Sequence, residues 1–229
     1  MKKAYFILSA FLLQLTIRAQ VLFYQDFESG TLLPMIAIDM DSLIINPNIA
    51  SIAGPTFQVV QQQPHNKSAV SASWFDHIDQ ADDWLISPPI SVTEANTFLS
   101  WDAYSPDANY RDGYEVRIST TDNQIASFTT LVMNVAAELT TWKRRNISLK
   151  PYTGQTIYFA FRNHSTDKYL LHMDNIKVEV LKNKDVVLKK LTYEKYNPVE
   201  TDIPVQVLIE NHGADTINSF ILEFGLNGV

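Results

Sequence analysis

The stretch Gln155-Thr-Ile-Tyr-Phe-Ala-Phe-Arg-Asn163 decides the fold of this chain. Ile157, Phe159 and Phe161 occupy alternate positions, and Tyr, Ala and Arg fill the positions between them. Side chains of a β-strand point to opposite faces in turn, so this pattern predicts a strand with one buried face. The same alternation in Gly113–Thr120 predicts a second strand of this kind. Both are expected to be antiparallel, with the opposite face in solvent.

Similar short runs continue on both sides of this stretch, separated by polar turn residues. They are rich in aromatic and β-branched residues, which favour strands, and no long helical period interrupts them. The sequence therefore predicts an all-β sandwich. The remaining runs are Val21–Phe27, Thr56–Gln61, Ser68–Trp74, Trp84–Ser87, Thr97–Tyr104, Trp142–Leu149 and Tyr169–Val180.

The segment 181–185, Leu-Lys-Asn-Lys-Asp, is short, charged and free of aromatic residues, which is typical of a linker. It separates a first domain, 21–180, from residues 186–229. Beyond it lie three further runs, Val186–Glu194, Ile203–Asn211 and Thr216–Phe224. Three strands are too few for an independent sandwich. We therefore expect the start of a second, truncated, immunoglobulin-like β-sandwich.

The first 20 residues have the pattern of a secretory signal peptide. Lys2 and Lys3 precede an apolar run that is too short to span a membrane, and Ala19 offers a cleavage point. Cleavage would take the net charge from −7 to −10, because Arg18 is lost with the two lysines. An acidic chain repels nucleic acid and anionic lipid and attracts divalent cations. The absence of cysteine excludes disulfides and thiolate metal sites.

Asp174 is the most informative acidic residue. Strand parity places it on the same face as Ile176 and Val178, which are expected to be buried, so its carboxylate requires a cation, a hydrogen bond or a proton. Calcium takes six to eight oxygen ligands and can join separate segments. Alternatively, Asp174 pairs with an arginine and the other acids are solvated turn formers. Further carboxylate oxygens are available from Asp26, Glu28, Asp39 and Asp41.

Two more acidic groups stand apart from these. Asp76, Asp79, Asp82 and Asp83 are interpreted as a polar loop that leads into a buried strand. The second group, Asp102, Asp107, Arg111 and Asp112, surrounds two tyrosines. Exposed aromatic rings beside polar groups bind sugars, whereas ordinary core or rim packing is the alternative. The candidate ligand-binding residues are Tyr104, Tyr110, Trp74 and Asp112, and we expect Trp84, Trp101 and Trp142 in the core.

Five segments in order resemble the cleaved adhesin family, also called the choice-of-anchor J domain, over residues 21–180. They are Phe23–Gly30, Ile38–Asp41, Asp82–Pro89 (with the motif Trp-Leu-Ile-Ser-Pro), the pair Ser100–Ser105 with Arg111–Ser119, and the pair Thr156–Arg162 with Asp167–Ile176. This resemblance implies a jelly-roll sandwich related to MAM domains, structural calcium, adhesion or haemagglutination, and export by type IX secretion. It assigns the metal to Glu28, Asp39, Asp41 and Asp174, with Asp26 as a further candidate.

No nucleophile elbow, zinc-protease motif, phosphate loop or dinucleotide fingerprint occurs, and the histidines are widely spaced. We therefore expect a protein that is not an enzyme. The predicted function is an exported, calcium-binding adhesion module of a bacterial surface protein. It would be secreted or held at the cell surface within a longer polypeptide, and its partner would be a host or environmental protein or glycan. The alternative is an accessory carbohydrate-binding module of a secreted hydrolase.

Overall fold

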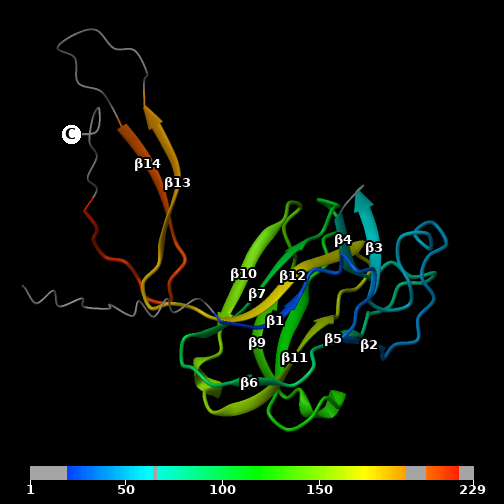
Figure 1. Ribbon diagram of the computed structural model, residues 1–229. Helices are drawn as coiled ribbons and strands as arrows, with labels where there is room; N and C mark the ends of the chain where they lie inside the picture. The colour runs from blue at the N-terminus through cyan, green and yellow to red at the C-terminus, as the bar shows by residue number, and fades with distance from the viewer. Residues whose placement is uncertain (1–19, 64–65, 194–204, 222–229) are drawn as a thin grey trace, which may run out of the picture.

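A computed structural model describes residues 20–63, 66–193 and 205–221, and it is built almost entirely from antiparallel strands. Two six-stranded sheets face each other (Figure 1). The first sheet has the order β10-β7-β12-β4-β3, and β1 also pairs with β12. Its strands are β1 (Gln20–Gln25), β3 (Gln58–Gln63), β4 (Asn66–Ala72), β7 (Thr97–Tyr104), β10 (Lys143–Ser148) and β12 (Leu170–Val180).

The second sheet has the order β2-β5-β11-β8-β9, and β6 also pairs with β11. Its strands are β2 (Ile36–Asp39), β5 (Asp83–Ile86), β6 (Ile90–Val92), β8 (Tyr114–Ser119), β9 (Thr130–Val135) and β11 (Gln155–Asn163). Two single-turn 3-10 helices, η1 (Ile125–Ser127) and η2 (Lys150–Tyr152), complete the domain. Within the described ranges, no helix has the length and apolarity needed to cross a lipid bilayer.

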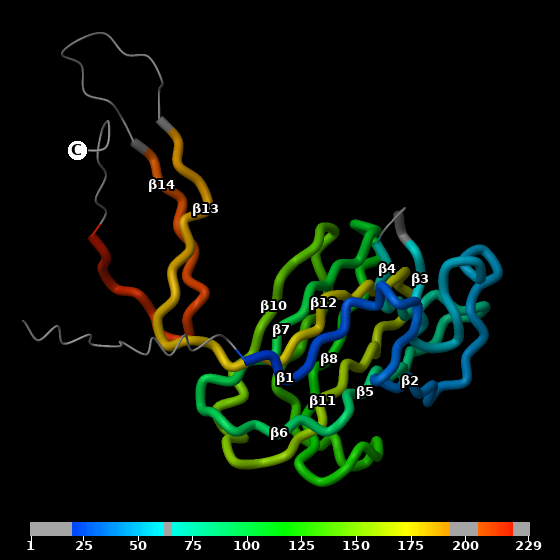
Figure 2. The backbone as a smooth tube through the Cα atoms, viewed as in Figure 1, coloured from blue at the N-terminus to red at the C-terminus, as the bar shows by residue number. Residues whose placement is uncertain are grey.

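The long strand β12 joins the beginning and the end of the sandwich. Its first half pairs with β4, and its second half pairs antiparallel with β1, where Gln20 lies opposite Val180. In Figure 2 the first strand and β12 run side by side although they are separated by most of the domain's sequence. The terminal strands of the domain are thus held together by a backbone ladder.

The core lies between the two sheets and is rich in aromatic rings. Phe159 and Phe161 from β11 point into it, as their alternation predicts, and neither is exposed. Trp101 packs edge-on against Phe161, and its indole N–H donates to the hydroxyl of Tyr114 at 2.8 Å. Burial of such rings is the main source of stability in a domain without disulfides. The predictions for Trp84 and Trp101 are confirmed, because both are buried.

The predicted all-β sandwich is confirmed, and each run predicted in the first domain contains or overlaps a strand of that domain. Three short strands, β2, β6 and β9, have no counterpart in the prediction. The prediction for Trp142 is wrong: it precedes β10 and remains 41% exposed. It lies beyond the strand, so strand alternation does not turn it inward. The predicted signal peptide lies outside the described residues, except for Gln20, which begins β1.

The residues after the sandwich form a two-stranded hairpin of β13 (Val186–Tyr193) and β14 (Val205–Asn211). The third predicted strand, Thr216–Phe224, is wrong for residues 216–221, which are not strand, and its last residues lie outside the described residues. The predicted linker 181–185 is held by backbone hydrogen bonds. Leu181 N–H donates to Asn96 C=O, and Ala214 N–H donates to Lys182 C=O.

Candidate functional site

Three carboxylates meet where β2 and β5 lie side by side. Asp39, the last residue of β2, is the register partner of Asp83, the first residue of β5. One oxygen of Asp39 accepts hydrogen bonds from the backbone N–H groups of Asp41 and Ser42, which turns the chain and brings Asp41 back toward the strand end. One ligand oxygen from each of Asp39, Asp41 and Asp83 lies within 4.8 Å of the others. We call this group the acidic triad.

Asp83 is the buried member of the acidic triad. It has no exposed surface, and its Oδ2 accepts a hydrogen bond from the Ser71 hydroxyl at 2.8 Å. Its Oδ1 and the Thr56 hydroxyl beside it are also buried; the two groups do not form a hydrogen bond of normal geometry, although the Thr56 hydroxyl favours the ionised form of Asp83. Burial, together with the negative charges of Asp41 and Asp39, raises the pKa of Asp83 to about 8. Ionising a buried carboxylate beside two others is costly, and a bound cation would reduce that cost.

The chemistry of the acidic triad fits a hard divalent cation. Calcium binds flexible sets of carboxylate, hydroxyl and water oxygens, and no soft ligand is present in the triad. Asp39 and Asp41 are half-buried, so water can reach the ion position from the open side. An ion here would be held by Asp39, Asp41 and Asp83, and it would supply a positive charge that joins the β2 turn to β5.

The structure divides the predicted metal ligands into two groups. Asp39 and Asp41 belong to the acidic triad, whereas Asp26 and Glu28 lie near Asp174, where their charges raise its pKa. Glu28 is engaged with Lys67, whose backbone N–H donates to Oε1 at 2.8 Å. The acidic pattern of residues 76–83 predicts a polar loop for Asp83, whereas the structure places it at the start of β5. The available signal was its position directly before the apolar run Trp84-Leu-Ile, which makes it a strand residue.

Asp174 is buried, as predicted, but it lies on the other face of β12. Met173 and Ile176 both point into the core, and the register of β12 against β7 shifts between Asp174 and Lys177. The extra residue, Asn175, has a φ of 49°, which marks a β-bulge. The parity argument is therefore wrong. Asp174 lies opposite Asp102, and burial, followed by the charges of Asp102, Glu28 and Asp26, raises its pKa to about 7.

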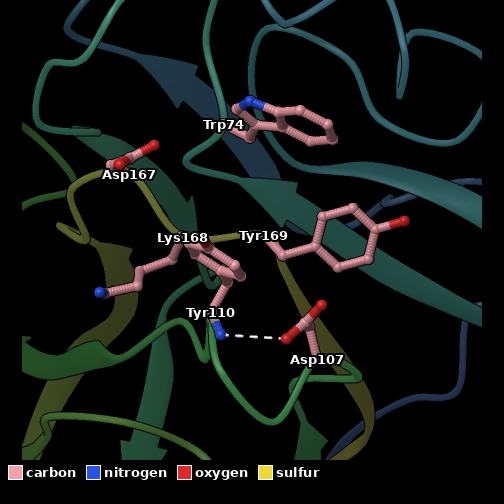
Figure 3. A pocket seen from close by; sticks show the side chains of 6 residues that line it. All are labelled: Trp74, Asp107, Tyr110, Asp167, Lys168 and Tyr169. Carbon is pink, nitrogen blue, oxygen red and sulfur yellow. Dashed lines mark hydrogen bonds between the residues drawn. The ribbon is translucent and has the colours of Figure 1, made fainter.

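A pocket of about 460 Å³ opens where three segments between strands meet (Figure 3). We call it the loop pocket. Its wall comes from the segment after β4, the loop between β7 and β8, and the segment before β12. The ring centroids of Trp74 and Tyr169 are 6.1 Å apart, and Tyr110 is 51% exposed. The lining residues are Trp74, Asp107, Tyr110, Asp167, Lys168 and Tyr169.

Two of the four predicted ligand-binding residues, Trp74 and Tyr110, line the loop pocket, whereas Tyr104 and Asp112 do not. Tyr104 lies on the outer face of the first sheet, where its ring stacks on His172 with centroids 4.5 Å apart. Trp142 packs against the same tyrosine at 4.4 Å. Burial lowers the pKa of His172 to about 3, so this histidine is neutral at physiological pH. Sequence reasoning missed Tyr169, which it assigned to a strand.

Asp112 lies behind the loop pocket and is fully buried. Its carboxylate accepts hydrogen bonds from the Ser73 hydroxyl at 2.7 Å, the Asn163 side-chain amide at 3.2 Å and the Tyr169 backbone N–H at 2.9 Å. Burial raises its pKa to about 6, although these hydrogen bonds favour the ionised form. Because Ser73 adjoins Trp74, one carboxylate fixes the backbone beside two of the pocket's aromatic rings. Asp112 therefore positions the pocket wall and does not face the pocket.

Comparisons with known proteins agree with this architecture. A sequence model of the cleaved adhesin domain matches residues 36–178, more than half of the chain. Over 116 residues the chain is 30% identical to Hemagglutinin A of Porphyromonas gingivalis, a match that covers 42% of this chain and 4% of that protein. This chain therefore aligns with a small part of that relative.

Solved structures of two domains of Lys-gingipain from the same organism share the fold. The K3 cleaved adhesin domain of Lys-gingipain from Porphyromonas gingivalis superimposes with a TM-score of 0.56 and 22% identity, over 71% of this chain and 99% of the domain. The K1 domain gives a TM-score of 0.52 and 22% identity, over 68% and 96%. The family resemblance inferred from the sequence is confirmed: this chain belongs to the cleaved adhesin domain family and carries an adhesin-type β-sandwich.

Proposed function

We propose that this chain is an exported, calcium-binding adhesion module that binds a host or environmental protein or glycan, without catalysing a reaction. The observation that carries the calcium assignment is the fully buried carboxylate of Asp83, one oxygen of which lies within 4.8 Å of carboxylate oxygens of Asp39 and Asp41. An ion in the acidic triad would fix the turn after β2 against β5. A rigid sandwich with fixed loops is the usual support for a recognition surface.

Membership in the adhesin family supports binding as the activity of the domain, and the relative named as a haemagglutinin supports a location outside the cell. The signal-peptide pattern of Lys2, Lys3 and the following apolar run is consistent with export. Recovery of a chain with Gln20 near its N-terminus from the culture medium or the cell surface would support this part of the proposal. An intact N-terminus in the cytoplasm would contradict it.

Calcium should stabilise the full chain, and Asp39→Asn should weaken that effect. The amide oxygen of asparagine can still accept the hydrogen bonds from Asp41 and Ser42, so the turn is retained while the ion loses a charged ligand. A ligand at 100 times its Kd stabilises a protein by about 2.7 kcal/mol. Thermal melts in calcium and in EGTA, with calorimetric titration, measure the effect.

The matched control is Asp79→Asn, which removes the same charge from an exposed position outside the triad. We expect calcium to raise the melting temperature of the wild type and the control, and we expect Asp39→Asn to raise the calcium Kd at least about tenfold, or about 1.4 kcal/mol. Equal melts in calcium and EGTA would refute the calcium assignment. Adhesion is tested separately by binding of the calcium-loaded chain to panels of immobilised matrix proteins and glycans.

The second candidate function is an accessory carbohydrate-binding module of a secreted hydrolase, and the loop pocket favours it. Trp74, Tyr110 and Tyr169 present aromatic rings around one cavity, with charged side chains beside them. Exposed aromatic rings with nearby polar groups are typical of sugar sites. Selective binding to plant or microbial polysaccharides would favour the accessory module. Binding to host proteins or to host-type glycans would favour the adhesin.

A further inference from the structure

We propose that the loop pocket binds a neutral pyranose unit of a glycan, which stacks on the aromatic wall and hydrogen-bonds to the charged residues at the pocket's edge. This inference rests on the proposed recognition function and names its ligand class. The volume of about 460 Å³ falls within the range of roughly 300–1,000 Å³ found for small-molecule sites. No residue of the acidic triad lines the pocket, so the two candidate sites use different residues.

The aromatic wall supplies flat apolar surface from three separate segments. Figure 3 shows the rings of Trp74, Tyr110 and Tyr169 around the same space. The C–H faces of a pyranose ring are apolar, and they pack against aromatic rings while the hydroxyl groups remain at the ring edge. Tyr110 is 51% exposed, so its ring is accessible to a ligand before binding.

The polar residues carry both signs of charge. Asp107 uses Oδ1 to accept hydrogen bonds from the backbone N–H groups of Asn109 and Tyr110, which fixes the loop, and its Oδ2 accepts none within the described chain. Asp167 adds a second carboxylate and Lys168 adds an ammonium donor. A sugar hydroxyl both donates and accepts hydrogen bonds, so it can use both kinds of group. Two carboxylates would repel an anionic ligand, and the lysine would repel a cationic ligand.

The wall of the loop pocket is held in place before any ligand arrives. Asp112 fixes the Tyr169 backbone N–H, and the Ser73 hydroxyl accepts a hydrogen bond from Lys168 N–H at 3.2 Å. Asp167 has a φ of 50°, a conformation that costs free energy in a residue other than glycine and that persists when its surroundings fix it. A preorganised wall lowers the entropic cost of binding a small, rigid ligand.

The competing occupant is a lysine or arginine side chain of a protein partner, because aromatic rings and carboxylates also attract cations. The lining carries two carboxylates and one lysine, so charge alone does not decide between the two occupants. Three aromatic rings around a volume of about 460 Å³ match a sugar ring better than one long side chain, so we favour the neutral sugar, and the cationic side chain becomes one outcome of the test.

The test uses the full chain with calcium and saturation-transfer NMR. The sugar probes are methyl glycosides of glucose, galactose, mannose and N-acetylglucosamine, and the cationic probes are lysine amide and arginine amide. We expect saturation of the ring protons of at least one glycoside, and a loss of affinity of about five- to tenfold on Tyr110→Ala. The matched control is Tyr24→Ala, which removes a tyrosine of 50% exposure outside the pocket. It should leave the affinity unchanged.

Three outcomes would overturn the inference: no glycoside signal at millimolar concentration, equal losses in both variants, or a Tyr110-dependent signal from the amino-acid amides alone. A protein partner that binds the calcium-loaded chain would preserve the proposed adhesion function in each of these cases. Failure of all binding, including the adhesion panels, would instead count against the proposed function itself. Melting temperatures of both variants exclude unfolding as the cause of a loss.

Discussion

At the scale of single residues, the buried carboxylate of Asp83 lies beside the half-buried carboxylates of Asp39 and Asp41. A carboxylate that is fully buried beside two acidic neighbours lowers the stability of the fold when it is ionised. This energetic cost is the reason that the pKa of Asp83 is raised. The sign follows from linkage: stability contributed by a group with a raised folded-state pKa is present at low pH and is lost as the pH rises.

Asp83→Asn should therefore change the melting temperature in opposite directions in EGTA and in calcium. In EGTA, the melting temperature of the wild type should fall as the pH rises from about 4 toward about 8, the folded-state pKa of Asp83, and the variant should lose part of this slope. At pH 8 in EGTA the variant should melt higher than the wild type, because it buries no charge. With calcium the order should invert, because the variant lacks a charged ion ligand.

A gain of about 1 kcal/mol corresponds to roughly 2–4 °C for a domain of this size, which scanning calorimetry resolves. Asp79→Asn, whose carboxylate is exposed, should behave as the wild type under every condition. The same pH slope in Asp83→Asn and the wild type would show that another group carries it.

Asp112 shows how burial changes the role of a residue that the sequence singled out. Its neighbours in the chain include Tyr110 and Arg111, which suggested contact with a ligand. The structure instead surrounds its carboxylate with donors from Ser73, Asn163 and Tyr169. Hydrogen bonds to a buried charged group are among the stronger ones in proteins, so Asp112 serves the pocket by fixing its wall.

At the scale of elements, the bulge in β12 decides which side chains face the outside of the first sheet. Asn175 adopts a left-handed conformation, its side-chain amide donates to Asp102 at 3.1 Å, and its Oδ1 accepts from the Tyr24 hydroxyl at 3.0 Å. One inserted residue reverses the parity of the strand, so Met173 and Ile176 both reach the core. Asp174 is thereby left on the outer face.

Substitutions at Asn175 should separate the backbone requirement from the side-chain contacts. Asn175→Val should destabilise the chain by about 2 kcal/mol or more, because a β-branched residue is strained at positive φ and the two hydrogen bonds are lost. Asn175→Gly loses the same hydrogen bonds but tolerates the conformation, so it should cost less. Urea unfolding measures both. If valine and glycine lowered the free energy of unfolding equally, the left-handed backbone conformation at residue 175 would not be the cause of the loss.

At the scale of the whole molecule, the junction between the sandwich and the hairpin is more structured than a flexible linker. Asp185 C=O accepts hydrogen bonds from the N–H groups of His212 and Gly213, and Leu181 is bonded to Asn96. A Cβ atom at Gly213 would lie 2.6 Å from Asp185 N and 2.8 Å from Asn183 O. Glycine is therefore required there by the close approach of two backbone segments.

Gly213→Ala should loosen the hairpin and leave the sandwich intact. The added methyl group would push residues 183–185 away from residue 213, and hydrogen exchange should become faster in β13 and β14. The calcium-dependent melting transition should be unchanged, because no residue of the acidic triad touches this junction. Thr216→Ala, at an exposed position nearby, is the control. Loss of the calcium effect in Gly213→Ala would mean that the two units depend on each other.

The sequence by itself determined the strands of the sandwich and the family. The alternation of Ile157, Phe159 and Phe161 is a local pattern, and it favours a strand because burial of one apolar face stabilises that conformation. The ordered segments that carry the family resemblance are equally local. The short strands β2, β6 and β9 escaped prediction because three to six residues give too little periodicity, and their pairing partners stabilise them.

Only the tertiary structure decided which acids and which rings come together. Asp83 joins Asp39 through strand pairing between segments more than 40 residues apart, and Tyr169 meets Trp74 and Tyr110 where three loops converge. The bulge at Asn175 moved Asp174 to the opposite face. Register, bulges and loop convergence depend on contacts between distant segments, and a sequence pattern carries no direct record of them.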